Sequence, residues 1–318
     1  MRYLRGGQMK IVNQSAVLLE HNKHPYKFIS DVAHTCYKAD AFPDDRLDLA
    51  TNFVKRLFNS GHRSTLEHEY VYFFLDIKAM NNFLNNEPKA LTYINIGENY
   101  ISGSLRAWIE FIPWAMGAVD DEIIRLLAEK YSEIIDPQRD IGIMSDRYGT
   151  VKMVSREDVI EANPLGIMNL IPHTVRFVTN RGVSHELCRH RPVAISMESQ
   201  RYVGYDKDKF GHQIEVITPM IDTESSAYND WHYAMLMAET QYMNLRSAGI
   251  KPEIARGVLP NDCKTELVVT ATESEWQHII NLRYTGTTGT PHPQIKELMG
   301  MALPLLQKES NNRIKGGN

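Results

Sequence analysis

The 318-residue sequence contains only three cysteines, Cys36, Cys188 and Cys263, and they lie far apart in the chain. An odd number of widely spaced cysteines excludes a disulfide framework, and no Cys-x-x-Cys pair is present to bind zinc. No apolar run approaches the roughly 20 residues that span a bilayer. The N-terminus lacks the apolar centre of a signal peptide, and Met1 and Met9 are both candidate starts. These absences predict a cytoplasmic protein that does not bind membranes.

A large excess of one charge sign is also absent. The sequence has 35 Lys and Arg against 39 Asp and Glu, which gives a formal net charge of −4. Proteins that coat nucleic acids need an extended basic surface, so we expect no nucleic-acid partner. The content of 43% hydrophobic and 23% charged residues is ordinary for a globular protein. Any anion site must therefore come from a local cluster of basic residues.

Strand-like and helix-like segments mix without a regular alternation, and there are no repeats or low-complexity linkers. The patterns predict strands at 10–20, 70–77, 91–100, 173–178, 215–218 and 264–272. They predict helices at 25–37, 43–61, 78–86, 101–111, 120–135, 225–248, 252–258 and 273–284, with a last one ending near 306, and a loop at 137–162. We therefore predict a single α+β domain over 1–318, in which helices flank a mainly antiparallel sheet. A polar tail from about 308 is expected to be disordered.

The densest chemistry lies in Arg189–Tyr202, which holds three arginines, one histidine, two serines and one tyrosine. Burying an unpaired arginine is expensive, whereas its planar donors match phosphate and carboxylate oxygens well. These residues alone leave two interpretations open: a pocket for a phosphate-bearing ligand, or a solvated turn.

Three further blocks carry polar residues in turns or at helix ends. The first is Gly61-His62-Arg63-Ser64-Thr65-Leu66-Glu67-His68, the second is Arg256-x-x-Leu259-Pro260, and the third is Asn281-Leu282-Arg283. Taken alone, His62 is typical of a surface turn and Arg283 of a helix end, where its charge faces the helix dipole.

Together these blocks resemble the signatures of the flavin-dependent thymidylate synthases. Arg189-His190-Arg191, seven further residues, Ser199 and then Arg201-Tyr202 matches the central signature, and the other three blocks occur in the same chain order. The resemblance covers most of the chain except 114–165, which we interpret as a peripheral insertion. It implies the thymidylate synthase-complementing fold and a homotetramer with sites shared between subunits.

The resemblance also implies a reaction. The family converts dUMP to dTMP, taking the carbon from 5,10-methylenetetrahydrofolate and a hydride from FAD that NADPH has reduced. Its cofactor-binding positions correspond to His62, Ser64, Arg189, His190, Arg191 and His278. Its dUMP-binding positions correspond to Glu186, Arg189, Ser199, Gln200, Arg201, Arg256 and Arg283. By the same resemblance Glu67 and His68 hold the loop that carries His62.

Arg283 is the predicted catalytic residue, because a guanidinium at the pyrimidine edge stabilises the ionised ring as an oxyanion hole would. The three cysteines lie in apolar segments without an adjacent histidine and are expected to be buried rather than nucleophilic. Ser199 lacks a general base in the sequence and is not expected to be a nucleophile. No metal site is expected, because His185-Glu186 and His190 are one residue too far apart for a zinc-protease helix.

The chain departs from the family at four positions. Glu186 stands where a glutamine is usual and would have to find a hydrogen-bond donor. Met197 stands where glutamate or glutamine is common, and Thr272 and His278 stand where asparagines lie near the flavin. Two other functions are compatible with the same residues: a non-catalytic nucleotide-binding protein, and a single-stranded nucleic-acid binder that stacks bases on Arg and Tyr side chains.

Overall fold

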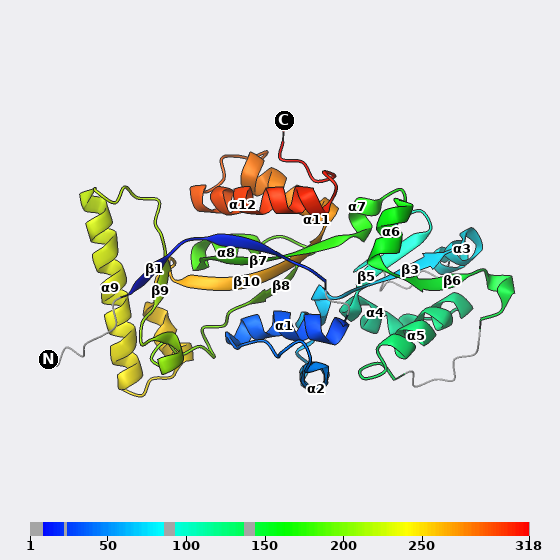
Figure 1. Cartoon of the computed structure of the whole chain (residues 1–318), viewed down its shortest axis with the longest axis horizontal. Coiled ribbons are helices and arrows are strands. Elements are labelled where there is room, and N and C mark those ends of the chain that lie inside the picture. Colours follow the sequence, from blue (N-terminus) through cyan, green and yellow to red (C-terminus); the bar gives the residue numbers. More distant parts are fainter. Residues whose placement is uncertain (1–8, 22–23, 86–92, 137–143, 318) are drawn as a thin grey trace.

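The computed structural model describes residues 9–21, 24–85, 93–136 and 144–317. Three regions lie side by side along its longest axis (Figure 1): a long helix with a two-stranded sheet, a central four-stranded sheet, and an outer four-stranded sheet. None of the helices in these ranges is long and apolar enough to cross a membrane.

The central sheet is antiparallel throughout. Its order is β2 (Ser15–Leu19), β7 (Pro172–Asn180), β10 (Lys264–Thr272) and β8 (Ala194–Met197). Helices α11 (Glu273–Ile280) and α12 (Pro293–Glu309) cover one face and α1 (Pro25–Tyr37) the other (Figure 1). The alternation of β10 explains both layers, since Leu267 and Val269 are buried in the core of α11 and α12, and Val268 in the core of α1.

The outer sheet has its own core and begins much earlier in the chain than the predicted insertion at 114–165. Its order is β4 (Ile94–Ile96), β5 (Tyr100–Ser104), β3 (Tyr70–Leu75) and β6 (Val151–Val154). The helices around it are α3 (Ile77–Asn85), α4 (Leu105–Phe111), α5 (Ala118–Lys130) and α6 (Arg156–Ala162). Phe73, Trp108 and Ile123 share one buried cluster. The loop predicted at 137–162 was therefore wrong for β6 and α6, which are too short to give a clear period; 137–143 lie outside the described residues.

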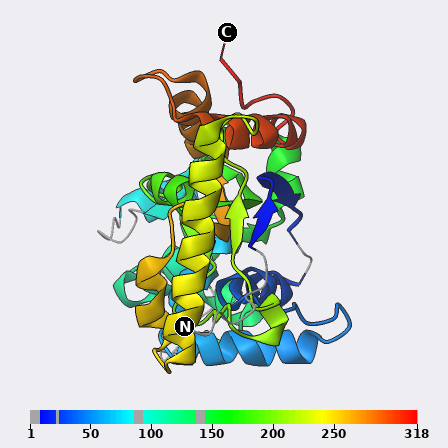
Figure 2. The ribbon, with the colours of Figure 1, turned by 90° about the vertical axis from the view of Figure 1, so that its left-hand side faces the viewer.

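The third region stands across the opposite end of the central sheet (Figure 2). It contains α9 (Ser226–Ser247), the parallel pair β1 (Lys10–Val12) and β9 (Glu215–Ile217), and α10 (Pro252–Ala255). Tyr205, Met235, Tyr242 and Cys263 form its buried core. We call this region the α9 region.

Most predicted elements are confirmed, including α1, α2 (Leu47–Asn59), α9, α11, β7 and β10. The class is α+β, and every strand pair described is antiparallel except β1–β9. The assignment of the whole chain to one domain remains a prediction. The strand predicted at 91–100 lies partly outside the described residues; from Tyr93 onward it contains β4, the turn at 97–99 and the first residue of β5. The helix predicted at 101–111 was wrong for 101–104, which belong to β5.

The expectation of a disordered tail was wrong. Arg313 donates two hydrogen bonds of 2.6 Å to the buried carboxylate of Glu273, and Ile314 is fully buried in the core of α11 and α12. The backbone N–H of Lys315 donates to Gln277 of α11. A polar sequence did not reveal this order because the countercharge that orders the tail lies 40 residues upstream.

Candidate functional site

The central motif is divided by a strand that the sequence did not predict. Residues 194–197 form β8, which pairs with β10 at the edge of the central sheet. Arg189–Arg191 therefore precede the strand and Ser199–Arg201 follow it. The backbone N–H of Ser199 donates to the carbonyl of Cys36 at the end of α1. The motif thus forms two separate groups rather than one continuous turn.

The first group surrounds Arg283. Its Nη1 donates to Glu186 Oε2 at 2.8 Å, its Nε to His190 Nε2 at 3.0 Å, and its Nη2 to the Glu186 carbonyl at 3.3 Å. We call these three residues the arginine cluster. Glu186 lies in α8 (Arg181–Leu187), and Arg283 lies in the π-helical turn Asn281–Thr285 that extends α11. Such turns often occur at functional sites, because the extra residue redirects a side chain.

His190 is only 6% exposed, and burial, with Arg283 and His278 nearby, lowers its pKa to about 4. The imidazole is therefore neutral near pH 7. A neutral imidazole has one donor and one acceptor nitrogen, so Nε2 accepts from Arg283 and Nδ1 carries the proton. The cluster thus has one cation, one anion and a neutral acceptor.

Glu186 has found the donor that its position requires, since Arg283 supplies both a hydrogen bond and the countercharge. A guanidinium has five N–H donors. Three are used inside the cluster, which leaves two for a ligand. The cluster therefore holds Arg283 in a fixed orientation with donors to spare.

His278 lies next to the cluster, with its ring centroid 5.9 Å from that of His190. Ligand atoms of His190, His278 and Glu275 lie within 4.8 Å of one another, close enough to hold a cation. However, His190 Nε2 already accepts from Arg283, and a dication would lie beside that guanidinium. This geometry disfavours a metal, and its absence remains a prediction.

The second group is the turn Ser199–Arg201, which we call the serine turn. Arg201 is exposed, and the Ser199 hydroxyl accepts from its backbone N–H at 3.3 Å. Gln200 does not face an open site, because it is 9% exposed and donates to Cys263 Sγ at 3.6 Å. Its side chain therefore supports the turn in this structure instead of presenting an amide to a ligand.

Arg256 is exposed in the 3₁₀ turn Arg256–Val258 that follows α10. Its neighbours Ala255 and Leu259 pack in the same core as Val203, the second residue after the serine turn. Arg256 and the serine turn therefore belong to the α9 region. In the described part of the chain, no hydrogen bond or ion pair joins either of them to the arginine cluster.

His62 and Ser64 are exposed at the start of the 3₁₀ helix η1 (Arg63–His68). His68 ties this helix to the central sheet through hydrogen bonds to Thr270 Oγ1 at 2.8 Å and Ser196 Oγ at 3.0 Å. Glu67 forms an ion pair with Arg106, at the start of α4. As expected, Glu67 and His68 hold the loop, but no described hydrogen bond links His62 or Ser64 to the arginine cluster.

A cavity of about 620 Å³ lies where η1, the outer sheet and the residues before β8 meet. It is lined by Arg191 of the predicted site, by Thr272, one of the departures from the family, and by Tyr93, Asn95 and Arg106 from outside the predicted site. No motif in the sequence pointed to these last three. They lie far from the motif in the chain, and only the packing of the two sheets brings them to it.

The family model described as "Thymidylate synthase complementing protein" matches residues 151–310, half of the chain. A flavin-dependent thymidylate synthase of Geobacter sulfurreducens is 34% identical over 104 residues, or 33% of this chain and 44% of that protein. One of Pyrococcus furiosus is 31% identical over 104 residues, or 33% of this chain and 42% of that protein. The chain therefore matches less than half the length of these relatives.

Two solved structures are similar over nearly the whole chain at low identity. One is the UMP/dUMP methylase PolB from Streptomyces cacaoi bound with 5-Br UMP, with 12% identity, a TM-score of 0.43 and coverage of 97% of this chain and 98% of that one. The other is ThyX from Helicobacter pylori complexed with FAD and dUMP, with 13% identity, a TM-score of 0.40 and coverage of 95% and 98%. Similarity at this level supports no conclusion about ligands.

Proposed function

Because the chain belongs to the thymidylate synthase complementing protein family, we propose that it is a flavin-dependent thymidylate synthase. The reaction is the reductive methylation of dUMP to dTMP. The carbon comes from 5,10-methylenetetrahydrofolate, and NADPH supplies the electrons through FAD. The observation that carries the proposal is the orientation of Arg283 by Glu186 and His190 in a π-helical turn.

Arg283 is the proposed catalytic residue. Methylation at C5 of uracil needs electron density on that carbon, which is highest when the ring is ionised. The two N–H groups that Arg283 has to spare would donate to the O2 and N3 edge of the ring and stabilise its negative charge. The donors would need little reorganisation, since Glu186 and His190 already hold the guanidinium.

The cysteines offer no better route to activation. Burial raises the pKa of Cys36 and Cys188, and raises that of Cys263 to about 12, so none is poised to form a thiolate. Cys188 is exposed and Cys36 only partly buried, so the expectation that all three are buried holds for Cys263 alone. The neighbourhood of Cys188 nevertheless does not activate it, which favours activation by charge rather than by a thiol.

The residues present fit a flavin nucleotide. Arg189 and Arg191 are exposed, without a described side-chain partner, and suit a pyrophosphate. When bound, FAD supplies the hydride that reduces the transferred carbon. Within this chain, Arg189 and Arg191 would hold its anionic part, and His62, Ser64 and His278 would contact the cofactor as well. The contacts of NADPH and folate are not assigned.

We also propose that dUMP binds at a site shared between subunits of a homotetramer. The proposed nucleotide-binding residues lie in two groups that one chain does not join, with Glu186, Arg189 and Arg283 in one, and Ser199, Arg201 and Arg256 in the α9 region. A second copy that brings its serine turn to the arginine cluster would complete the site. Light scattering that detects only monomers at micromolar concentration would contradict this assembly.

The experiment is reconstitution of the purified protein with FAD, followed by assay of dTMP from dUMP, methylenetetrahydrofolate and NADPH. We expect a flavin absorbance spectrum and dTMP formation that stops when any one component is omitted. A protein that binds FAD and dUMP but forms no dTMP would be a nucleotide-binding protein. A protein that cannot be loaded with FAD would contradict the proposal at its first step.

A further inference from the structure

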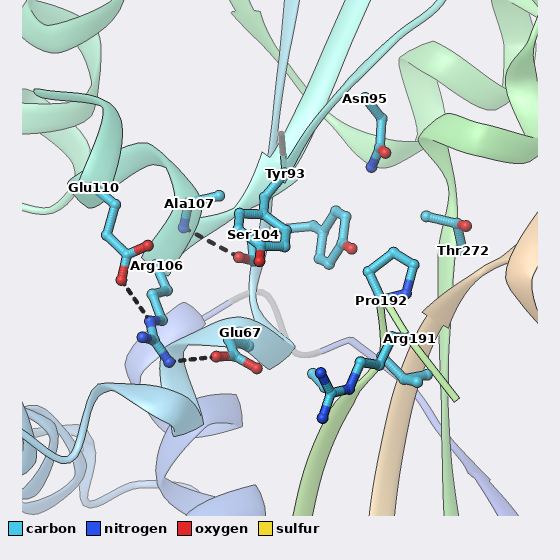
Figure 3. A pocket seen from close by; sticks show the side chains of 13 residues that line it. Glu67, Tyr93, Asn95, Ser104, Arg106, Ala107, Glu110, Arg191, Pro192 and Thr272 are labelled. Atoms are coloured by element: carbon cyan, nitrogen blue, oxygen red, sulfur yellow. Dashed lines mark hydrogen bonds and ion pairs between the residues drawn. The ribbon is translucent and has the colours of Figure 1, made fainter. Parts of the chain in front are cut away.

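The cavity of about 620 Å³ has two walls of different origin (Figure 3). One wall is formed by Arg191 and Pro192, which precede β8, and by Thr272 at the end of β10. Glu67, Arg106 and Glu110 line the opposite side (Figure 3). Tyr93, just before β4, and Ser104 of β5 lie beside them. Tyr93, Asn95 and Arg106 precede residue 151, so they lie outside the stretch that matches the family model.

Several polar side chains of the cavity are already paired. Arg106 donates to Glu67 at 2.5 Å and to Glu110 at 2.7 Å. The hydroxyls of Ser104 and Thr272 accept from the first turns of α4 and α11. These pairs fix the walls before any ligand arrives, so a ligand meets a preorganised cavity.

Three lining groups remain to contact a ligand. Arg191 is exposed and has no described hydrogen-bond or ion-pair partner. The side chain of Tyr93 is 60% exposed. The amide of Asn95 forms a hydrogen bond with the hydroxyl of Tyr70 and has further donors and acceptors for a ligand. A guanidinium binds an anion, an aromatic ring stacks on a planar ring, and an amide hydrogen-bonds to ring nitrogens and carbonyls.

Arg191 is the cation of the cavity that is available to an anionic ligand group. Arg106, the other cation, lies between Glu67 and Glu110 and pairs with both carboxylates. Arg191 has no described ion-pair partner, so a ligand can place one anionic group beside it. The volume lies within the range of about 300–1,000 Å³ that is usual for small-molecule sites.

We infer that this cavity binds a planar nitrogen heterocycle carried on a chain with an anionic group, with Tyr93 stacking on the ring, Asn95 at its edge and Arg191 on the anion. This inference rests on the proposed function, which offers two sources of such chemistry, the flavin and the folate. The outer sheet is then part of the site rather than a peripheral addition.

The test is Tyr93→Ala, with Tyr93→Phe to keep the ring and Trp114→Ala as the matched control. Trp114 belongs to the same region, is also 60% exposed, and does not line the cavity. FAD is titrated into the apoprotein, and tetrahydrofolate into the FAD-loaded protein. Loss of a stacking contact should weaken one of these affinities about tenfold in Tyr93→Ala, while Tyr93→Phe and Trp114→Ala stay near wild type.

The arm that responds identifies the ligand: weaker FAD binding assigns the cavity to the flavin, and weaker tetrahydrofolate binding with normal FAD assigns it to the folate. If wild type binds both ligands and Tyr93→Ala matches Trp114→Ala in both arms, the inference is overturned and the proposed function stands. If wild type binds neither ligand, the proposed function fails and the inference fails with it.

Discussion

His190 of the arginine cluster and the serine turn both belong to the Arg189–Tyr202 signature, but the two groups hold their arginines differently. In the cluster, Arg283 is held by three hydrogen bonds and one countercharge. In the α9 region, Arg201 and Arg256 are exposed, with no ion-pair partner among the described residues. A guanidinium in a fixed orientation, such as that of Arg283, suits negative charge that develops during a reaction. The exposed guanidinium groups of Arg201 and Arg256 suit the phosphate of a nucleotide whose base is bound by another subunit.

The largest effect is expected at Arg283. Arg283→Ala should lower the rate of dTMP formation by about 10²–10³, because it removes a donor to the charge that develops in the transition state. Arg283→Lys should not restore the rate, since lysine lacks the planar fork. Flavin absorbance and dTMP formation are measured on both. Arg125→Ala on α5 is the control, because Arg125 is likewise an ion-paired arginine, here with Glu122 and Glu129, and lies outside the proposed site. Near wild-type rates in FAD-loaded Arg283 variants would show that Arg283 is only a helix-end charge.

Mixing subunits tests whether the two groups meet across an interface. Arg283→Ala and Arg201→Ala should each be nearly inactive alone. If each site combines one group from each of two subunits, mixed oligomers should regain about a quarter of the wild-type sites. The two variants are unfolded and refolded together, and dTMP formation is compared with that of each variant refolded alone. No gain over the separate samples, with mixed oligomers shown by mass, would place both groups in one subunit.

The support of Arg283 by Glu186 should be visible in kcat. Glu186→Ala removes a hydrogen bond to a charged group, so kcat should fall by about tenfold to 100-fold. Glu186→Gln keeps an acceptor for Arg283 and should lose less. Steady-state kinetics in dUMP separates the two parameters. A raised KM with kcat unchanged would mean that Glu186 contributes to nucleotide binding alone and does not position Arg283.

The two regions should respond to pH in opposite directions. Glu239 of α9 is 3% exposed, its Oε1 lacks a described partner, and burial raises its pKa to about 7. A raised carboxyl pKa favours the folded state at low pH, and that stability is lost as pH rises from about 4.5 to 7. His190, with its pKa lowered to about 4, favours the folded state above about 6.5 and loses that stability as pH falls.

Glu239→Gln removes the ionisable group at the α9 end. It should raise the thermal midpoint at about pH 8 and change it little at about pH 5. Thermal melts of the variant and of wild type at both values measure this. An equal shift at both pH values would mean that packing, rather than the proton, sets the effect.

The smallest effect is expected when the cysteines are removed from both regions. The triple variant with Cys36, Cys188 and Cys263 changed to Ser should retain dTMP formation within about threefold of wild type, because none of the thiols is activated. Circular dichroism and flavin absorbance check that the variant folds and is loaded. Abolished turnover in such a sample would establish a thiol mechanism.

The sequence predicted elements well where the signal is local. The helix predicted at 225–248 was bounded correctly at its start, where the Ser225 side chain accepts from the backbone N–H of Tyr228. The helix predicted from residue 101 starts only after Ser104, whose side chain accepts from the backbone N–H of Ala107. β8 was missed because its four residues lie inside a motif whose polar residues serve function rather than sheet periodicity. Short edge strands of this kind are assigned by the partner strand, which the sequence does not identify.

The sequence proposes which residues form the site, but it does not predict how they are arranged. The resemblance selected Glu186, His190 and Arg283, yet their contacts span 93 and 97 residues of sequence and depend on how α11 packs. The burial of Gln200 against Cys263 depends in the same way on β10. A linear motif identifies which residue types are present, whereas the orientation of each side chain is fixed by elements far away in the chain.

His68 has a consequence for ligand selection. It is fully buried and neutral, because burial lowers its pKa to about 3, and it bridges Ser196 of β8 to Thr270 of β10. It directly follows Glu67 on one side of the cavity, and Ser196 closely follows the opposite wall at Ala194. The chain from Glu67 to His68 and the hydrogen bonds of His68 therefore fix the distance between the two walls. If the cavity binds a planar ring system, analogues with one additional fused ring should not fit, at acidic as well as neutral pH, because the walls do not move apart.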